Sequence, residues 1–209
     1  MNFDIRSYRV GPIQTNCYFM INTDTKETLV VDPGDEPKRL AQLLRQDGLK
    51  PAAILLTHGH FDHITGVAGL VAEFPMPVYA HETERALIES EASDPFFGGD
   101  TPFEINVDNY IKGEPELSLA GFRIKVYTTP GHTPGGVCYY FDDEKVLFSG
   151  DTLFCGSVGR TDFPGGSMSS LVRSIKEKLL ALDDDVKVYP GHDRTTSIGF
   201  ERLYNPFID

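Results

Sequence analysis

The stretch THGHFDH, residues 57–63, carries three of the chain's six histidines together with an aspartate. The four side chains are His58, His60, Asp62 and His63, and they follow directly after the apolar run AAILL. Neutral imidazoles suit zinc, and carboxylates also allow iron or manganese. A solvated polar loop does not need so many metal-competent groups at this density, so the spacing predicts metal binding.

Three further candidates stand in equivalent places, each just beyond the end of an apolar, strand-like run. They are His132 in VYTTPGHTPGG, Asp151 in KVLFSGD and His192 in VKVYPGH. Loops that follow the strands of packed sheets can converge on one edge. Residues 58 and 60 can point the same way from an extended segment, while 62 and 63 face a neighbouring point at the turn into a helix. One loop could therefore serve two metals.

Short apolar runs rich in β-branched and aromatic residues alternate with helical patterns, which is typical of an α/β fold. The expected strands are 18–22, 28–32, 52–57, 122–128, 137–141, 145–149 and 186–189. Helices are predicted between Asp35 and Gly48, from about Ile64 to Phe74, and after Ser167, where apolar residues repeat at helical spacing. Residues 90–116 are predicted to form a long loop region with little regular structure.

Composition excludes several classes of function. A chain of 209 residues, 40% of them apolar, favours one globular domain. The net charge of -12 leaves no basic stripe to follow a phosphate backbone, so no nucleic-acid partner is expected. No segment resembles a secretory signal or reaches the roughly 18 apolar residues of a membrane span, so a cytoplasmic protein without a membrane partner is expected. The three widely spaced cysteines are expected to be reduced, and the oligomeric state stays open.

The order HGHFDH, GH, D and H resembles the metallo-β-lactamase superfamily. Within it, the segments TNCYF, VVDPGD, TPGHTPGG, LFSGDTLF, GSVGRTDFPGG and YPGHDRTT are similar to those of glyoxalase II-like hydrolases of the short, single-domain kind. The resemblance spans nearly the whole chain. It implies an αββα sandwich of two mixed sheets flanked by helices, with a binuclear metal site at one edge.

The resemblance also implies a role for each candidate. One metal would be held by His58, His60 and His132, the other by Asp62, His63 and His192, and Asp151 would bridge both. Two divalent ions are implied, zinc first, with iron or manganese as alternatives. Ions about 3.5 to 4 Å apart can share a water and lower its pKa from about 15.7 to near 7. Asp62 and Asp151 are the predicted catalytic residues, and Asp62 would also steer the proton of the attacking water.

Two residues outside the ligand set have two interpretations each. Asp32, in VVDPGD, is predicted to hold a ligand imidazole in one tautomer, or else to cap the turn before Pro33. Arg160, in GSVGRTDF, is a candidate substrate-binding residue that would contact an anionic group, or else a salt-bridge partner of Asp162.

The predicted function is hydrolysis of a small-molecule thioester, with a hydroxyacylglutathione as the first candidate. A thiol with a pKa near 8.5 leaves as thiolate with little need of a general acid. Two-domain glyoxalase II enzymes carry a C-terminal helical extension that contacts glutathione, whereas this chain ends soon after His192. A single domain over 1–209 without that extension is therefore expected, and specific recognition of glutathione stays open.

An aspartate rather than a cysteine at Asp151 argues against a β-lactam hydrolase of the commonest zinc class. Two alternatives to the thioester hydrolase remain. Persulfide dioxygenases of the same superfamily share the GRTDF segment and bind one iron, which here would be held by His58, His132 and Asp151. The other alternative is a non-catalytic metal-binding protein, although structural zinc sites are usually rich in thiolates.

Overall fold

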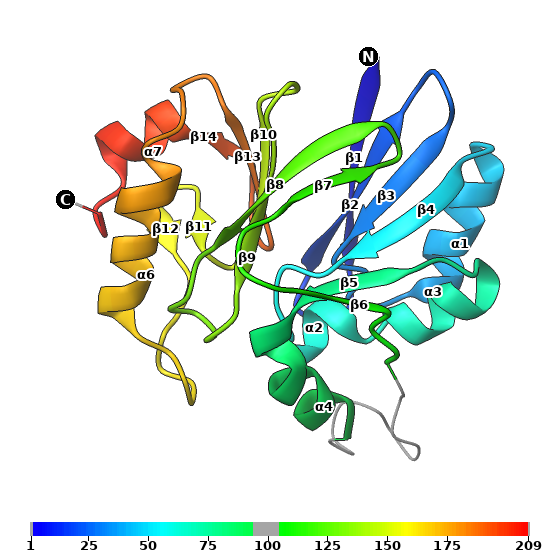
Figure 1. Ribbon diagram of the computed structural model, residues 1–209, viewed down its shortest axis with the longest axis horizontal. Helices are drawn as coiled ribbons and strands as arrows, with labels where there is room; N and C mark the ends of the chain where they lie inside the picture. Colours follow the sequence, from blue (N-terminus) through cyan, green and yellow to red (C-terminus); the bar gives the residue numbers. More distant parts are fainter. Residues whose placement is uncertain (1, 94–104, 209) are drawn as a thin grey trace.

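Two six-stranded sheets lie face to face, and helices cover the outer surface of each (Figure 1). The computed structural model describes residues 2–93 and 105–208. Apolar side chains from both sheets fill the space between them, among them Met20 and Leu29 from one sheet and Val126, Tyr139 and Phe148 from the other. The predicted αββα sandwich is confirmed.

The first sheet has the strand order β1-β2-β3-β4-β5-β6. Its strands are β1 (Phe3–Val10), β2 (Thr15–Asn22), β3 (Glu27–Val31), β4 (Lys50–Leu55), β5 (Val78–His81) and β6 (Asn109–Ile111). Strands β1 to β3 are antiparallel and β3 to β6 are parallel. Every residue of β2 is buried, because Phe19 and Ile21 face the helices while Tyr18 and Met20 face the second sheet.

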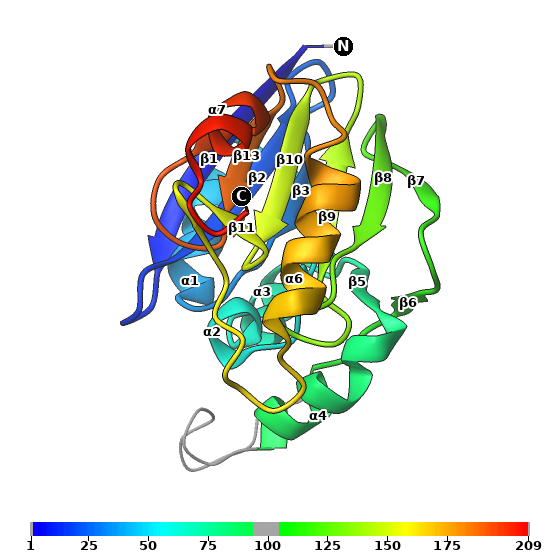
Figure 2. The same ribbon diagram turned by 90° about the vertical axis from the view of Figure 1, so that its left-hand side faces the viewer.

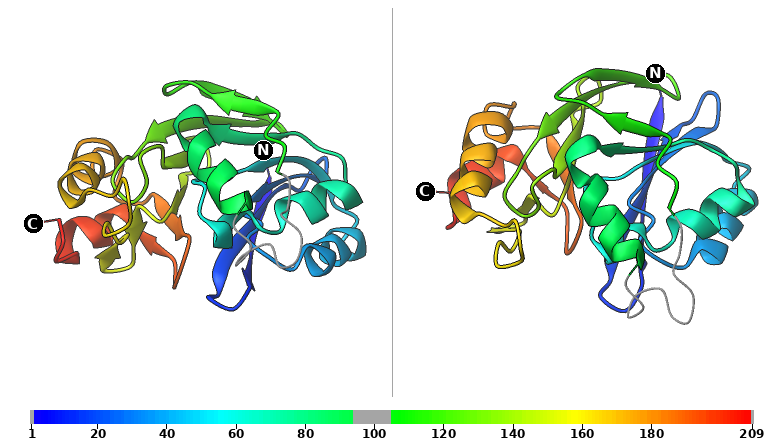
Figure 3. Two further views of the ribbon diagram at one scale, coloured as in Figure 1. Left: turned by 90° about the horizontal axis from the view of Figure 1, so that it is seen from below. Right: turned by 60° about the horizontal axis from the view of Figure 1, so that its bottom comes forward.

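Helices follow the parallel strands of this sheet as crossover connections. They are α1 (Pro37–Gln46), α2 (Phe61–Ile64), α3 (Val67–Glu73), the 3₁₀ turn η1 (Glu82–Glu84) and α4 (Arg85–Ser93). Leu40 and Leu44 lie one helical turn apart in α1, and together with Leu70 of α3 they pack against the outer face of the sheet. Helix α4 lies below the two sheets (Figures 1 and 2), and the view from below places it between the two halves of the molecule (Figure 3).

The second sheet has the order β14-β13-β10-β9-β8-β7 and is also mixed, because β10 and β13 are parallel. Its strands are β7 (Glu116–Leu119), β8 (Phe122–Thr128), β9 (Val137–Phe141), β10 (Val146–Gly150), β13 (Lys187–Pro190) and β14 (Thr196–Ser197). The strands β11 (Leu153–Phe154) and β12 (Ser157–Val158) form a separate hairpin. The outer face is covered by α6 (Met168–Ser174), its π-helical continuation η2 (Ile175–Leu179), and α7 (Ile198–Tyr204).

The seven predicted strands are present as β2, β3, β4, β8, β9, β10 and β13. The pattern missed β1, whose sequence FDIRSYRV is half exposed at the sheet edge and carries too many polar residues to stand out. The loop predicted over 90–116 is wrong in part, because α4 runs to Ser93 and β6 and the start of β7 lie within the range. Residues 94–104 of that prediction lie outside the described part of the chain. Among the described helices, none combines the length and apolar character needed to cross a membrane.

Candidate metal centre

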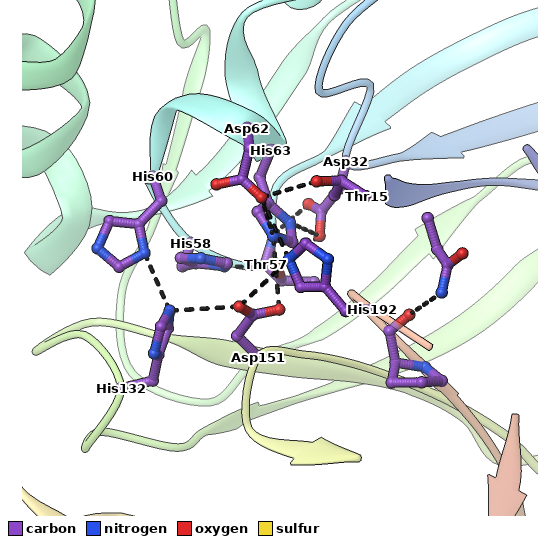
Figure 4. A network of polar contacts seen from close by, with 12 residues as sticks. Thr15, Asp32, Thr57, His58, His60, Asp62, His63, His132, Asp151 and His192 are labelled. Carbon is purple, nitrogen blue, oxygen red and sulfur yellow. Dashed lines mark hydrogen bonds and ion pairs between the residues drawn. The ribbon is translucent and has the colours of Figure 1, made fainter. Parts of the chain in front are cut away.

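The loops after β4, β8, β10 and β13 meet at one edge of the sandwich, and the predicted ligands lie together there (Figure 4). The structure brings together all seven: His58, His60, Asp62, His63, His132, Asp151 and His192. Because four separate segments supply them, the grouping depends on the packing of the two sheets and not on any one motif.

His58, His60 and His132 form the first group. One donor atom from each lies within 4.8 Å of the other two. His60 Nδ1 and His132 Nε2 are 2.9 Å apart, and the rings of His58 and His132 meet edge to face with centroids 4.9 Å apart. Three imidazoles from two loops thus converge on one point, an arrangement that can hold a divalent ion.

Asp62, His63 and His192 form the second group, with donor atoms again within 4.8 Å of one another. Asp62 Oδ2 lies 3.3 Å from His63 Nε2 and 3.2 Å from His192 Nε2. Thr15 Oγ1 donates a hydrogen bond of 2.7 Å to the same oxygen and so fixes the carboxylate. One carboxylate and two imidazoles form a set that suits zinc, iron or manganese.

Asp151 stands between the two groups. Its Oδ2 lies 3.5 Å from His132 Nε2, in the first group, and 3.6 Å from His192 Nε2, in the second. Its Oδ1 lies 3.4 Å from His63 Nε2. The carboxylate therefore faces both groups at once, which is the position a bridging ligand requires.

Asp32 and Thr57 orient two of the imidazoles by contacting the Nδ1 atoms of His63 and His58. Asp32 accepts hydrogen bonds from the Thr57 N–H (2.8 Å) and hydroxyl (2.6 Å), and its Oδ2 lies 2.8 Å from His63 Nδ1. Since a carboxylate only accepts here, His63 Nδ1 carries the proton. The Thr57 hydroxyl gives its own proton to Asp32, so at 3.1 Å it accepts from His58 Nδ1. Both rings therefore present an unprotonated Nε2 to the site when neutral.

Arg160 orients a third imidazole, but through its backbone. His132 Nδ1 donates to the Arg160 carbonyl at 2.7 Å, which directs His132 Nε2 toward Asp151. The Arg160 guanidinium makes two bonds of 2.7 Å to Asp162 and lies 4.0 Å from the centroid of the Phe163 ring. This arginine thus lines the site as one half of an ion pair.

Buried polar atoms test whether these residues fit a metal. Some buried polar atoms of the described side chains have no hydrogen-bond partner, and three of these atoms lie in this site: His58 Nε2, His63 Nε2 and Asp151 Oδ1. Leaving such atoms unsatisfied costs roughly 1 to 3 kcal/mol each. A divalent cation would satisfy all three. The donor set therefore fits divalent metal ions.

Protonation differs between the two groups. Burial and the neighbouring imidazoles lower the pKa of His58 well below its usual range and lower that of His60 to about 4. These rings are neutral near pH 7, the form that binds metal. Burial also opposes the charged form of His63, but the carboxylates of Asp62 and Asp151 outweigh it and raise the pKa of His63 well above its usual range.

Gly191 leaves space at the centre of the site. A Cβ at this position would lie 2.2 Å from Asp151 Oδ1 and 2.7 Å from His63 Cε1. No side chain fits at those distances, so glycine allows the strand end before His192 to approach both groups closely.

A cavity of about 770 Å³ opens over the site. Its wall combines His60, Asp62, His132, Asp151 and His192 with the apolar side chains of Ile13, Phe61, Leu87, Phe154, Val158 and Phe163. Among the described lining residues, Arg160 is the one cation, and its charge is already paired. The space is large enough for a small-molecule substrate.

Two residues that support the site were not predicted individually. Thr15, which holds Asp62, lies in the quoted segment TNCYF. Glu84, whose carboxylate accepts the N–H groups of Gly59 and Gly135, lies in HETERALIE, where an acidic residue at the start of a helix is ordinary and carries no sequence signal.

Comparison with known proteins gives a family and close relatives. The family profile described as the metallo-beta-lactamase superfamily matches residues 10–192. The chain is 41% identical over 207 residues to the probable metallo-hydrolase YqgX of Bacillus subtilis, covering 98% of this chain and 97% of that protein. It is 38% identical over 212 residues to the hydroxyacylglutathione hydrolase GloC of Haemophilus influenzae, covering 100% of this chain and 99% of that protein.

Two solved structures are similar over almost their whole length. The BLEG-1 B3 metallo-beta-lactamase superposes with a TM-score of 0.90 at 41% identity, covering 98% of this chain and 99% of that one. TTHA1623 in a di-iron-bound form superposes with a TM-score of 0.85 at 38% identity, covering 97% of this chain and 99% of that one.

Proposed function

Because the chain belongs to the metallo-β-lactamase superfamily, we propose that it is a binuclear metal-dependent hydrolase of thioesters, with hydroxyacylglutathiones as the first substrate class. The observation that carries the proposal is the position of Asp151, which faces both groups of ligands. The similarity to GloC of Haemophilus influenzae supports the substrate class.

In this proposal His58, His60 and His132 would hold one divalent ion, Asp62, His63 and His192 would hold the other, and Asp151 would be a ligand of both. When bound, the ions supply Lewis acidity, which lowers the pKa of water and polarises a carbonyl group. Zinc is the expected ion. The di-iron-bound form of TTHA1623 supports iron as an alternative.

The chain's own side chains then position the reactants. The thioester lies in the cavity, and a water oxygen attacks its carbonyl carbon while the C–S bond breaks and the sulfur leaves as thiolate. Asp62 lines the cavity, and its carboxylate, held by the Thr15 hydroxyl, accepts a hydrogen bond from that water and steers its proton, which passes to the solvent with the products. Asp32 and the Arg160 carbonyl keep His63 and His132 in the tautomer that the site requires.

Metal content tests the binuclear assignment directly. Because the groups His58–His60–His132 and Asp62–His63–His192 share no residue, the protein should bind about two divalent ions per chain after reconstitution with zinc. Elemental analysis of the dialysed protein measures this. One firmly bound ion in the presence of excess zinc would contradict a binuclear site.

The charge of the cavity wall predicts weak selectivity for the glutathione moiety. Arg160 is the one cation among the described lining residues, and Asp162 already pairs with it. We therefore expect kcat/KM for lactoylglutathione to exceed that for a truncated thioester with the same acyl group by less than roughly 10³-fold. A larger ratio, worth about 4 kcal/mol or more of transition-state binding, would reveal a dedicated glutathione pocket.

Hydrolysis of a β-lactam is a second candidate, because the BLEG-1 B3 metallo-beta-lactamase is 41% identical to this chain. A cephalosporin assayed with the same zinc-loaded preparation separates the two functions. The thioester proposal expects kcat/KM to be higher for lactoylglutathione. The reverse order would favour the β-lactam.

A further inference from the structure

Glu84 is a buried carboxylate that joins two loops of the metal centre. It ends η1 and has no exposed surface. Its Oε2 accepts the N–H of Gly59 and its Oε1 accepts the N–H of Gly135, each at 2.7 Å. Gly59 lies between two ligand histidines, and Gly135 follows His132 by three positions. One carboxylate therefore contacts the backbone between His58 and His60 and also the loop that carries His132.

The two loops meet on the ligand side as well. Thr57 O accepts the N–H of Val137 at 2.9 Å, and His60 Nδ1 lies 2.9 Å from His132 Nε2. Glu84 thus joins, through backbone N–H groups, the same two loops that meet through the side chains of His60 and His132. A change in its length or in its acceptor atoms would alter the separation of the loops.

The close approach of Glu84 depends on glycine at both contacts. A Cβ on Gly135 would lie 2.9 Å from Glu84 Oε1 and 2.7 Å from Thr83 Cβ. A Cβ on Gly59 would lie 2.8 Å from Ile88 Cγ1 in α4. Such distances are too short for a carbon atom, so any larger residue would force the loops away from the carboxylate.

Burial of this charge needs a reason beyond stability. Desolvation raises the pKa of Glu84, and hydrogen bonds from the loop N–H groups oppose that rise. In the described part of the chain, no hydrogen bond or ion pair joins Glu84 to a lysine or arginine. An apolar residue of similar volume often serves stability as well as a buried charge does. A carboxylate, however, offers two acceptor oxygens at a fixed spacing, and both are used here.

We propose that Glu84 is a positioning residue that sets the geometry of His58, His60 and His132 as ligands of one metal ion, acting through the N–H groups of Gly59 and Gly135. The inference rests on the proposed function, because it takes the first ligand group to be a metal site. It does not depend on which substrate the protein cleaves.

The test is Glu84→Gln, which keeps the shape of the side chain but removes one acceptor. A glutamine oxygen can accept one of the two N–H groups, while its NH₂ group then faces the other N–H, so one loop is released. Zinc dissociation constants are measured on the metal-free protein by competition with a chromophoric chelator. We expect one constant to rise 10- to 100-fold and the other to stay within about twofold. The visible absorption of the cobalt(II)-loaded protein should change as the geometry of that ion changes.

Glu201→Gln is the matched control. Glu201 has no exposed surface, and it too accepts a glycine N–H, from Gly156 at 2.9 Å. Its other hydrogen bonds come from Thr196 and Asn205, so it bonds to neither of the two loops that Glu84 joins. Both zinc constants and the cobalt spectrum should stay as in the parent protein. If Glu84→Gln also leaves them unchanged, or if the control weakens metal binding equally, the positioning role is wrong.

Gly135→Ala provides a second approach if Glu84→Gln does not fold. It displaces the carboxylate from one loop and leaves the charge in place. The same selective weakening of one metal is expected, and unchanged constants would overturn the proposal. If instead the parent protein binds two ions but cleaves no thioester, the proposed function fails while these metal measurements still decide the role of Glu84.

Discussion

Replacing Asp151 with alanine is expected to release metal from both ligand groups and to lower kcat/KM for thioester hydrolysis by at least about 10³-fold. The carboxylate is the one ligand candidate whose oxygens face His63, His132 and His192 together. Loss of Lewis-acid stabilisation is worth several kcal/mol, and each 1.36 kcal/mol is a factor of ten in rate. Elemental analysis and initial rates on the same preparation measure both effects.

Two further variants sharpen this result. His60→Ala removes a member of the first group only and should weaken mainly one metal. Asp185→Ala removes an exposed carboxylate that pairs with Lys145 and should change neither metal content nor rate. If Asp151→Ala retained two ions and full activity, Asp151 would not be the bridge.

The grouping of the ligand candidates was predictable because residue type and strand position agreed. His58, His132 and His192 each follow an apolar run that is a strand in the structure, and loops at one edge of two packed sheets converge. The sequence could not give the distances between them. That Asp151 lies within 3.6 Å of imidazoles from three different loops is a property of how the two sheets pack.

Asp32 and Arg160 each had two interpretations that local sequence could not separate. The Asp32 carboxylate bonds to Thr57 and His63, which lie far along the chain, and not to the backbone of the turn before Pro33. The Arg160 side chain pairs with its neighbour Asp162, while its carbonyl accepts from His132. Every residue has a carbonyl, so the sequence holds no sign that this one orients an imidazole.

Glu84 and Thr15 show a different limit. Each is separated from the loop it supports by 25 or more positions, and each makes its contact through a single side chain. Periodicity identifies the faces of helices and strands, but it does not report such pairs. The edge strand β1 and the short β6 were not predicted for a related reason. They are strands because they pair with β2 and β5, and their composition alone does not indicate a strand.

Zinc-loaded protein is expected to cleave lactoylglutathione under strict exclusion of oxygen. Hydrolysis needs water and a Lewis acid but no change of oxidation state, and zinc has no redox chemistry. The rival is a persulfide dioxygenase, which would hold a single iron through His58, His132 and Asp151. Such an enzyme needs iron with open positions for oxygen and sulfur, so zinc should inactivate it.

The iron-loaded form of the same preparation provides the complementary measurement. With glutathione persulfide in aerated buffer, an oxygen electrode should register no uptake above that of the metal-free protein. Both assays are referred to metal content, because partial occupancy would lower either rate. Asp62 and His192 separate the two mechanisms further, since they belong only to the second ligand group. His192→Ala should therefore impair thioester hydrolysis. A mononuclear iron site made by His58, His132 and Asp151 would keep all its ligands in this variant. Oxygen uptake that requires both iron and persulfide, together with no thioester cleavage by any metal form, would replace the hydrolase with the dioxygenase.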